Sequence, residues 1–221
     1  MEDIKKFIQY ELNILRPDGG KPRTGDVRKL SAKVYNKIKH LSFEEILDIC
    51  EDLLEERIWA YGIIAYDNAF RQKDKYTLET FDRFERWLFD YVRDWYDCDD
   101  FGTHALGALL LKYEDLYPRV LKWCEHPDFW VRRAAPVVLI YPVYKGASKV
   151  LNPFTISDKL LTDDHYLVLK GYGWLLKVYG MFNPGEVEDY ITRNKDEMPR
   201  VAFRYAIEKL ETSVRKKLMQ L

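Results

Sequence analysis

Small residues recur along the chain at steps of about 30–45 residues, inside segments whose apolar residues follow a helical period. They are Ala60 and Gly62, Ala105 and Gly107, Ala134 and Ala135, Gly171 and Gly173, and Ala202 and Ala206. This spacing is typical of helix-pair solenoids, in which small side chains let each inner helix approach its neighbours closely. Strand-like alternation with hairpin turns is absent from the sequence. We therefore expect an all-α fold, an α-solenoid of about five or six antiparallel helix pairs with a concave face, as a single domain over residues 1–221.

The clearest repeat unit spans residues 120–141. It reads as a short helix, a turn at residues 126–128, and a second helix whose first residues, 130–135, are WVRRAA. With Asp128 they form the pattern D-x-x-V-R-x-A-A, the signature of HEAT repeats, in which the Asp and Arg tie adjacent turns and the alanines pack. The expected solenoid is therefore HEAT-like.

The charge balance narrows the choice of partner. The 221 residues include 35 Lys and Arg against 36 Asp and Glu, a formal net charge of −1. This balance argues against a polybasic binder, but it permits a basic face that is balanced by an acidic back. Hydrophobic residues make up 47% of the chain, which is enough to bury a sizeable core.

The cysteines and the N-terminal residues indicate in which cellular compartment we expect the protein. Cys50, Cys98 and Cys124 lie far apart without C-x-x-C spacing, so we expect neither a disulfide framework nor a zinc cage. Residues 1–6, MEDIKK, include four charged residues and no apolar segment follows, so we expect no signal peptide and no membrane span. The histidines are scattered and no phosphate-binding glycine loop is present, so we expect no metal and no cofactor. These features predict a protein of the reducing cytoplasm.

Residues 94–101, DWYDCDDF, hold two aromatic residues and four carboxylates within seven positions. They lie before a helix that we expect through residues 104–107. Asp97, Asp99 or Asp100 could simply cap that helix, because Asp is favoured at helix starts. The alternative is that a carboxylate of this segment takes part in a reaction.

Arg132 and Arg133 permit two interpretations. In the structural one, Arg132 is exposed and Arg133 bonds a neighbouring turn, as arginines do in HEAT repeats. In the functional one, a guanidinium group on the concave face binds a phosphate.

Two later segments are unusual for helices. Residues 170–174, KGYGW, put two glycines inside a helix at a cost of ~1 kcal/mol each relative to Ala, which indicates close helix packing or close approach of a ligand. Trp174 could equally be a core residue. Arg200 and Arg204 are one turn apart and share a helix stripe.

These segments begin successive inner helices, so the solenoid would bring one charged residue from each onto a common concave rim. Those residues are Asp99, Arg133, Lys170 and Arg204. Basic groups interleaved with aromatic rings are what a nucleic-acid backbone requires. The pattern therefore favours a nucleic-acid groove.

Six motifs, in order, resemble those of the AlkD-like DNA alkylation repair family, the HEAT-like-repeat DNA glycosylases, over about residues 25–210. They are GDVR (25–28), ERIWA (56–60), WYDCD (95–99), WVRRAA (130–135), KGYGWLLK (170–177) and RYAIE (204–208). The resemblance implies a catalytic group of Asp99, Trp95, Arg133 and Trp174. It also implies DNA contacts from Tyr96, Arg132, Lys170, Lys177, Arg200 and Arg204.

Within that group, Asp99 would be the catalytic carboxylate and Arg133 its phosphate-binding neighbour. Trp95 and Trp174 would flank the sugar-phosphate of the lesion. The pair Tyr96 and Asp100 has the same spacing as Trp95 and Asp99, and we prefer the latter because the following residues, FGTHA, continue the resemblance.

The resemblance implies hydrolysis of the N-glycosidic bond of a cationic alkylated base, an N3-alkyladenine or N7-alkylguanine, in duplex DNA by a monomer. Such a base is already a good leaving group, so the reaction needs no general acid, and a carboxylate would stabilise the oxocarbenium-like sugar. Two alternatives stay open. One is a family member that binds DNA structure without catalysis, and the other is a HEAT-type scaffold for protein interaction.

Overall fold

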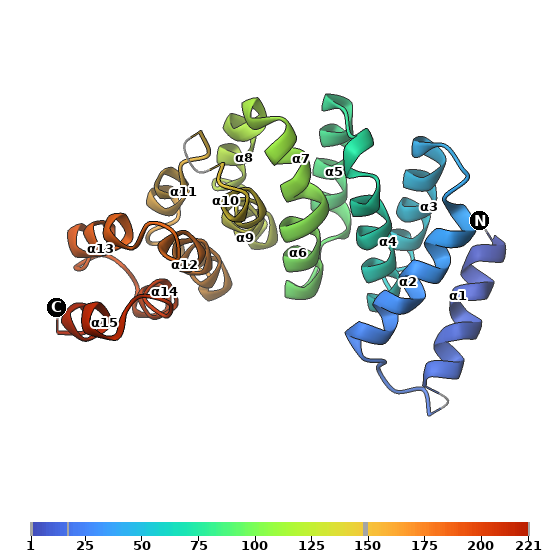
Figure 1. Cartoon of the computed structure of the whole chain (residues 1–221), viewed down its shortest axis with the longest axis horizontal. Coiled ribbons are helices and arrows are strands. Elements are labelled where there is room, and N and C mark those ends of the chain that lie inside the picture. Colours follow the sequence, from blue (N-terminus) through green and yellow to red (C-terminus); the bar gives the residue numbers. More distant parts are fainter. Residues whose placement is uncertain (1, 17, 148–149, 221) are drawn as a thin grey trace. The chain divides into compact units, whose positions relative to one another are not determined.

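The computed structural model describes residues 2–16, 18–147 and 150–220, and all regular secondary structure in these ranges is helical (Figure 1). This confirms the all-α prediction. The chain divides into two compact units, residues 1–105 and residues 106–221. The expectation of one domain stays a prediction.

The N-terminal unit is built around α4. Its α-helices are α1 (Glu2–Leu15), α2 (Thr24–Ile38), α3 (Phe43–Glu55), α4 (Trp59–Arg71), α5 (Leu78–Tyr91) and α6 (Trp95–Phe101). Helix α4 packs against both α2 and α3, and its small residues Ala60 and Gly62 are buried as expected. The side chain of Ser42 accepts a hydrogen bond from the Glu45 amide, and the Glu45 side chain accepts one in return, a capping box that starts α3.

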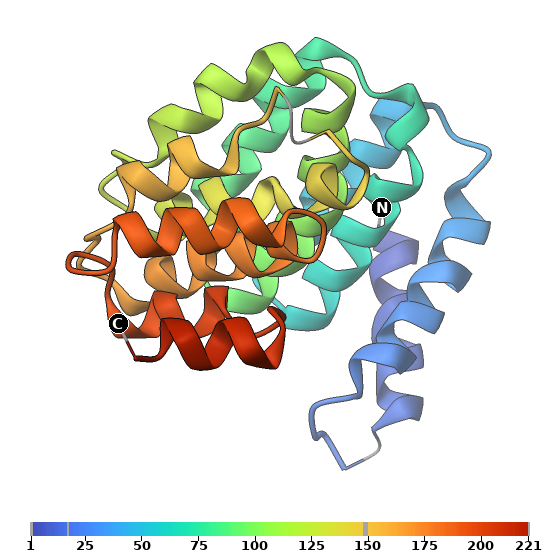
Figure 2. The same ribbon diagram turned by 60° about the vertical axis from the view of Figure 1, so that its left-hand side comes forward.

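The C-terminal unit is built around α12. Its α-helices are α7 (Gly107–Lys112), α8 (Tyr117–Trp123), α9 (Phe129–Val138), α10 (Ile140–Tyr144), α11 (Pro153–Lys159), α12 (Tyr166–Gly180), α13 (Pro184–Arg193), α14 (Arg200–Ala206) and α15 (Thr212–Leu218). Helix α12 packs against α9, α13 and α14, and α13 packs against α15. Figure 2 shows these last helices, coloured orange to red, stacked on one another.

Two glycines of α12 explain how closely its neighbours approach. A Cβ atom on Gly171 would lie 3.2 Å from Pro136 Cγ of α9. A Cβ atom on Gly173 would lie 2.8 Å from both the Ala202 carbonyl oxygen and Tyr205 Cβ of α14. Any larger side chain at position 173 would push α12 and α14 apart. Of the two interpretations of these glycines, close helix packing is therefore confirmed.

The start of α6 differs from the sequence expectation. The acidic segment does not precede a helix at residues 104–107. It forms a helix of its own that begins at Trp95 and is capped by Asp94. Five residues of π-helix, Gly102–Leu106, follow it. The expectation failed because any of four closely spaced Asp residues can cap a helix, and residue type alone does not choose between them.

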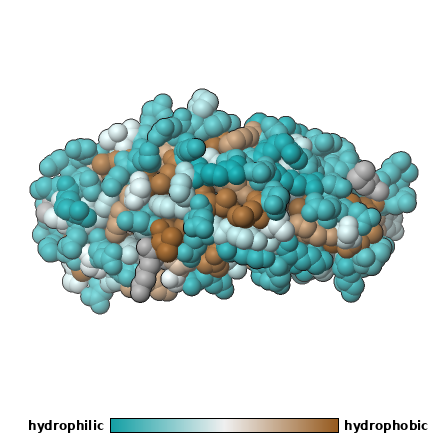
Figure 3. Space-filling view, turned by 90° about the horizontal axis from the view of Figure 1, so that it is seen from above, coloured by the Kyte–Doolittle hydropathy of each residue, from teal (hydrophilic) through white to brown (hydrophobic). Residues whose placement is uncertain are grey.

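The face of the molecule seen in Figure 3 is mostly hydrophilic, with small hydrophobic patches between the polar residues. Scattered apolar residues of this kind are ordinary on protein surfaces. None of the helices in the described ranges is both long and apolar enough to cross a membrane.

Candidate functional site

The first turn of α6 places an aromatic pair at the surface of the N-terminal unit. Asp94 Oδ1 accepts a hydrogen bond from the Asp97 amide at 3.0 Å, which fixes where the helix begins. Trp95 is the first residue after this cap and is 47% exposed. Its ring stacks on Tyr96 with the centroids 3.6 Å apart. The site therefore offers an exposed indole with its ring plane held by a neighbour.

A lysine from the loop before α2 lies over the rings of Tyr96 and Trp59. The Tyr96 ring packs edge-on against Trp59 of α4 with a centroid distance of 5.9 Å. The Lys21 ammonium group lies 4.0 Å from the Trp59 ring centroid and 4.5 Å from that of Tyr96. Cation–π contacts of this kind are worth about 0.5–2 kcal/mol, so Lys21 helps to hold the two rings in place.

Trp95 and Asp99 line the same cleft, whose volume is about 210 Å³. They are four residues apart on α6, so both side chains lie on one face of the helix. The other walls come from α2, α4 and the π-helical turn, and His104 of that turn is among them. The hydroxyl of Thr103 donates a hydrogen bond to the Asp99 carbonyl at 2.6 Å, so the π-helix also fixes the backbone at Asp99.

Asp100 has a different environment, although it borders the same cleft. Its Oδ1 atom accepts a hydrogen bond from the Arg28 guanidinium group. Arg28 also pairs with Asp67 of α4, at 3.4 Å. The Asp100 side chain is only 13% exposed. Asp100 thus belongs to an ion-pair network that joins α2, α4 and α6.

The Asp97 carboxyl group has a strongly perturbed pKa. Burial and then the negative charge of Asp94 raise its pKa to about 7. It lines a second cavity, of about 150 Å³, on the side of α6 that faces α4. A Cβ atom on Gly62 would lie 3.2 Å from Asp97 Oδ1, so the glycine leaves room for this carboxyl group.

In the C-terminal unit, Arg132 and Arg133 point to different partners. Arg132 forms ion pairs with Asp163 at 2.7 Å and Asp164 at 2.9 Å. It also donates hydrogen bonds to two carbonyl groups of the preceding turn. Arg133 is only 5% exposed, and its Nη1 atom donates to the Leu167 carbonyl of α12 at 2.6 Å. Both arginines therefore tie neighbouring turns together, and their contacts with DNA stay predictions.

Helices α12 and α14 bring several of the predicted DNA-binding residues together around Tyr205. The ammonium groups of Lys170 and Lys177 both lie 5.7 Å from the Tyr205 ring centroid. Trp174 lies between these lysines on α12, one turn from each, and is partly buried. Arg204 is exposed on α14 next to the tyrosine.

Arg200, the first residue of α14, lies over the Phe203 ring at 4.9 Å and donates to Met219 Sδ at 3.5 Å. The predicted residues thus form two groups, one on α6 in the N-terminal unit and one on α9, α12 and α14 in the C-terminal unit. Among the described residues no cluster of three His, Cys, Asp or Glu side chains is placed to hold a metal ion.

The sequence model of a family described as "DNA alkylation repair enzyme" matches residues 22–210. The chain belongs to this family. A solved structure described as a predicted DNA alkylation repair enzyme from Enterococcus faecalis is similar, with a TM-score of 0.74 and 18% identity over 86% of this chain and 87% of that one. At that identity the similarity shows the fold. A comparison with curated proteins found no match. The predicted family is therefore confirmed.

Three residues near α6 were not predicted from the sequence to contribute to the candidate site. Lys21 lies in a loop rich in Gly and Pro, where no periodic pattern indicates what a side chain contacts. Arg28 is part of the GDVR motif, but its partners Asp67 and Asp100 lie 39 and 72 residues away. Asp97 was considered only as a possible cap. Its apolar neighbourhood depends on α4 packing beside α6, which no local pattern reveals.

Proposed function

We propose that this member of the DNA alkylation repair family is a glycosylase that releases cationic alkylated bases, such as N3-alkyladenine and N7-alkylguanine, from duplex DNA. The observation that carries the proposal is the cleft in which Asp99 and the exposed Trp95 lie together. A carboxylate beside an exposed aromatic face suits a reaction in which positive charge develops on a sugar.

The chemistry needs few groups. The base leaves as a neutral molecule because it begins as a cation, so no side chain has to protonate it. As the glycosidic bond breaks, positive charge grows on the deoxyribose, and the Asp99 carboxylate stabilises it. The same carboxylate orients the water that attacks the sugar carbon. The Trp95 ring adds cation–π stabilisation on the order of 0.5–2 kcal/mol.

The contacts in the N-terminal unit favour Trp95 over Tyr96 as the exposed aromatic ring of the reacting pair, and Asp99 lies one turn from Trp95 on the same face of α6. The Tyr96 ring is held between Trp95 and Trp59, and Asp100 accepts a hydrogen bond from Arg28. Trp95, in contrast, exposes nearly half of its surface to solvent. In the proposal, Arg133 and Trp174 take the roles implied by the family resemblance, and the cations around Tyr205 bind phosphates.

The test is a single-turnover excision assay on duplex DNA treated with a methylating agent, with Asp99→Asn and Asp100→Asn compared. We expect Asp99→Asn to lose about 10²–10³-fold or more in excision rate, as when a charge-stabilising group is removed from an active site. We expect Asp100→Asn to keep most of the rate. Circular dichroism must show both variants folded, because Asp100 is part of an ion-pair network.

Excision by Asp99→Asn at the rate of the wild-type protein would refute the assignment. A loss of excision in Asp100→Asn but not in Asp99→Asn would assign the reaction to Tyr96 and Asp100 instead. Release of uracil, which leaves without a positive charge, as readily as 7-methylguanine would contradict the proposed lesion class. Tight duplex binding without release of any base would leave a DNA-binding protein without glycosylase activity.

The proposal also assigns the protein to the cytoplasm and treats it as a monomer. A monomer suffices because a single chain supplies both groups of candidate residues. Gel filtration at the concentrations used for the excision assay would check this point.

A further inference from the structure

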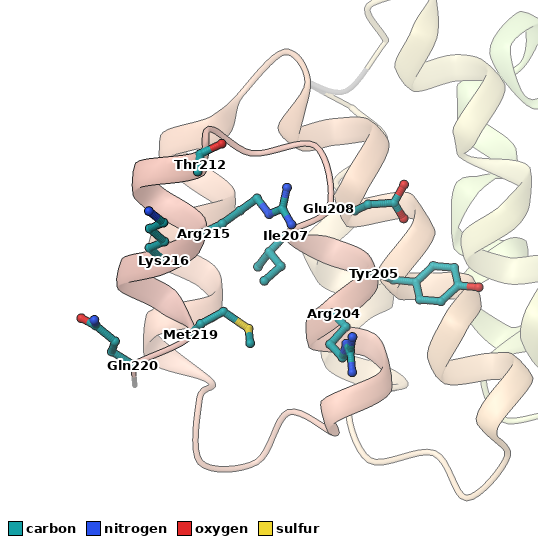
Figure 4. A pocket seen from close by; sticks show the side chains of 9 residues that line it. All are labelled: Arg204, Tyr205, Ile207, Glu208, Thr212, Arg215, Lys216, Met219 and Gln220. Carbon is teal, nitrogen blue, oxygen red and sulfur yellow. The ribbon is translucent and has the colours of Figure 1, made fainter.

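A cavity of about 800 Å³ opens between α14 and α15 in the C-terminal unit. Figure 4 shows Arg215 of α15 and Met219, the residue after this helix, reaching toward α14, and Ile207, which directly follows α14, pointing back toward them. Arg204 and Lys216 also belong to its lining. The cavity thus has an apolar floor with basic groups around it.

The basic groups of this cavity have no acidic partner in the described part of the chain. Arg204, Arg215 and Lys216 form no ion pair there, whereas many other cations of the protein do. The one acid of the lining, Glu208, already binds Lys177 at 3.2 Å. A cavity with three cations and a neutralised carboxylate attracts anions.

Helix α15 is held in place by other contacts. Lys217, the third cation of the run 215–217, pairs with Glu188 of α13 at 2.7 Å. Leu218 is 1% exposed and anchors the helix in the core. Arg215 and Lys216 are therefore not needed to attach α15, and their positive charges are available to bind an anionic ligand.

This helix lies beyond the residues that the family model matches, which end at residue 210. The wall that carries Arg215 and Lys216 is therefore not part of the region by which the family is recognised. The C-terminal unit as a whole is basic, with 18 Lys and Arg against 14 Asp and Glu, a formal charge of +4.

We propose that the α14–α15 cavity binds a phosphodiester of the DNA backbone. This proposal rests on the proposed function only in taking duplex DNA as the substrate. Arg204 and Arg215 approach the phosphate from opposite walls, because the planar guanidinium fork matches the geometry of phosphate oxygens. Lys216 adds charge at the rim. Ile207 and Met219 pack against the deoxyribose that follows the phosphate. Such a contact positions the duplex and reads no sequence.

The test measures binding of an unmodified, fluorescently labelled duplex by anisotropy over a series of salt concentrations. We expect the double variant Arg215→Gln/Lys216→Gln to reduce the slope of log K against log salt concentration by about 1 for each phosphate that the protein no longer neutralises. We expect Arg204→Gln to reduce it by a similar amount. Adding it to the double variant should have less than the full additional effect, since the residues share one phosphate.

The control is Lys217→Gln, which removes one positive charge from the adjacent residue of α15. Its ion pair with Glu188 is on the surface, where such pairs are worth about 0–1 kcal/mol, so the helix stays in place. A slope for Arg215→Gln/Lys216→Gln equal to that of Lys217→Gln would overturn the proposal, and so would a wild-type protein that binds no duplex.

The salt slope is independent of excision. If no base is released but the slope falls in the α15 variants, the phosphate site stands and the glycosylase assignment fails. If bases are released and the slope is unchanged, the glycosylase assignment stands and the phosphate site is wrong.

Discussion

The two units of the chain carry opposite charge. Residues 1–105 contain 17 Lys and Arg against 22 Asp and Glu, a formal charge of −5, whereas residues 106–221 carry +4. The near neutrality of the whole chain is therefore the sum of an acidic and a basic half. Net charge alone would have hidden the half that is suited to bind nucleic acid.

The same contrast holds at the candidate residues. On α6, the aromatic rings of Trp95 and Tyr96 lie among carboxylates, and the proposed reaction needs a negative group beside a developing cation. On α12 and α14, Tyr205 lies between Lys170 and Lys177, where a phosphate would be attracted. In the proposed function, the reacting pair Trp95 and Asp99 belongs to the acidic unit and the cations around Tyr205 belong to the basic unit. Four predictions test this contrast.

The largest expected effect concerns the acidic unit, in Asp97→Asn. With a pKa of about 7 in the folded protein, Asp97 holds a proton that the unfolded chain releases near pH 4. The folded state thus binds more protons over this window, so stability falls as pH rises from about 4 to 7 and levels off above 7. The amide variant avoids this loss. We expect it to be more stable than wild type at pH 8, by up to about 4 kcal/mol, with the advantage vanishing below about pH 4.

Thermal or urea unfolding at several pH values measures this difference. Asp196→Asn changes the same charge at an exposed position and serves as the control. If Asp97→Asn and Asp196→Asn have parallel pH profiles, then Asp97 is not the buried, acid-stabilised group that the structure indicates.

The next largest effect is expected in the basic unit, at the crossing of α12 and α14. Gly173→Ala would place a Cβ atom 2.8 Å from the Ala202 carbonyl oxygen and Tyr205 Cβ, so the helices must separate. We expect a loss of about 1–3 kcal/mol, despite the better helix propensity of Ala, and weaker duplex binding because Tyr205 moves relative to the lysines.

Gly185→Ala in α13 is the matched control, since a Cβ atom there has nothing within 4 Å. It should leave both stability and DNA affinity near those of the wild type. Equal behaviour of the two alanine variants would show that the close approach at Gly173 is not required.

These contacts also show how far the sequence alone could go. For the glycines of α12 the sequence allowed close helix packing or close approach of a ligand, because a glycine inside a helix is costly unless something lies against it, and the structure shows the packing. The all-α fold class followed from the helical period of the apolar residues, and the family followed from the six motifs. The partners of Arg132 were not foreseeable, since Asp163 lies 31 residues away and meets it only once α9 has packed. The cap of α6 was missed because four Asp residues compete for it, and the contact of Lys21 because it comes from an irregular loop.

A loss of stability in the same range is expected from Arg133→Ala, which asks whether an arginine that ties two helices also contacts DNA. The side chain is buried and donates to the Leu167 carbonyl, so its removal should cost about 1–3 kcal/mol of stability. If it also binds a phosphate, the salt slope of duplex binding should fall by about 1. A loss of stability with an unchanged slope would restrict Arg133 to its structural contact.

The smallest effect separates the two units most directly, because each contains a lysine that lies over aromatic rings. Lys21→Gln removes the cation over Trp59 and Tyr96 and should cost about 0.5–1 kcal/mol of stability, while the salt slope of DNA binding stays unchanged. Lys170→Gln removes the cation over Tyr205 and should reduce that slope by about 1, with a similar small loss of stability. The two variants change charge and residue type identically. An equal fall of the slope in both would show that backbone binding is not confined to the basic unit, and an unchanged slope in both would show that Lys170 does not bind a phosphate.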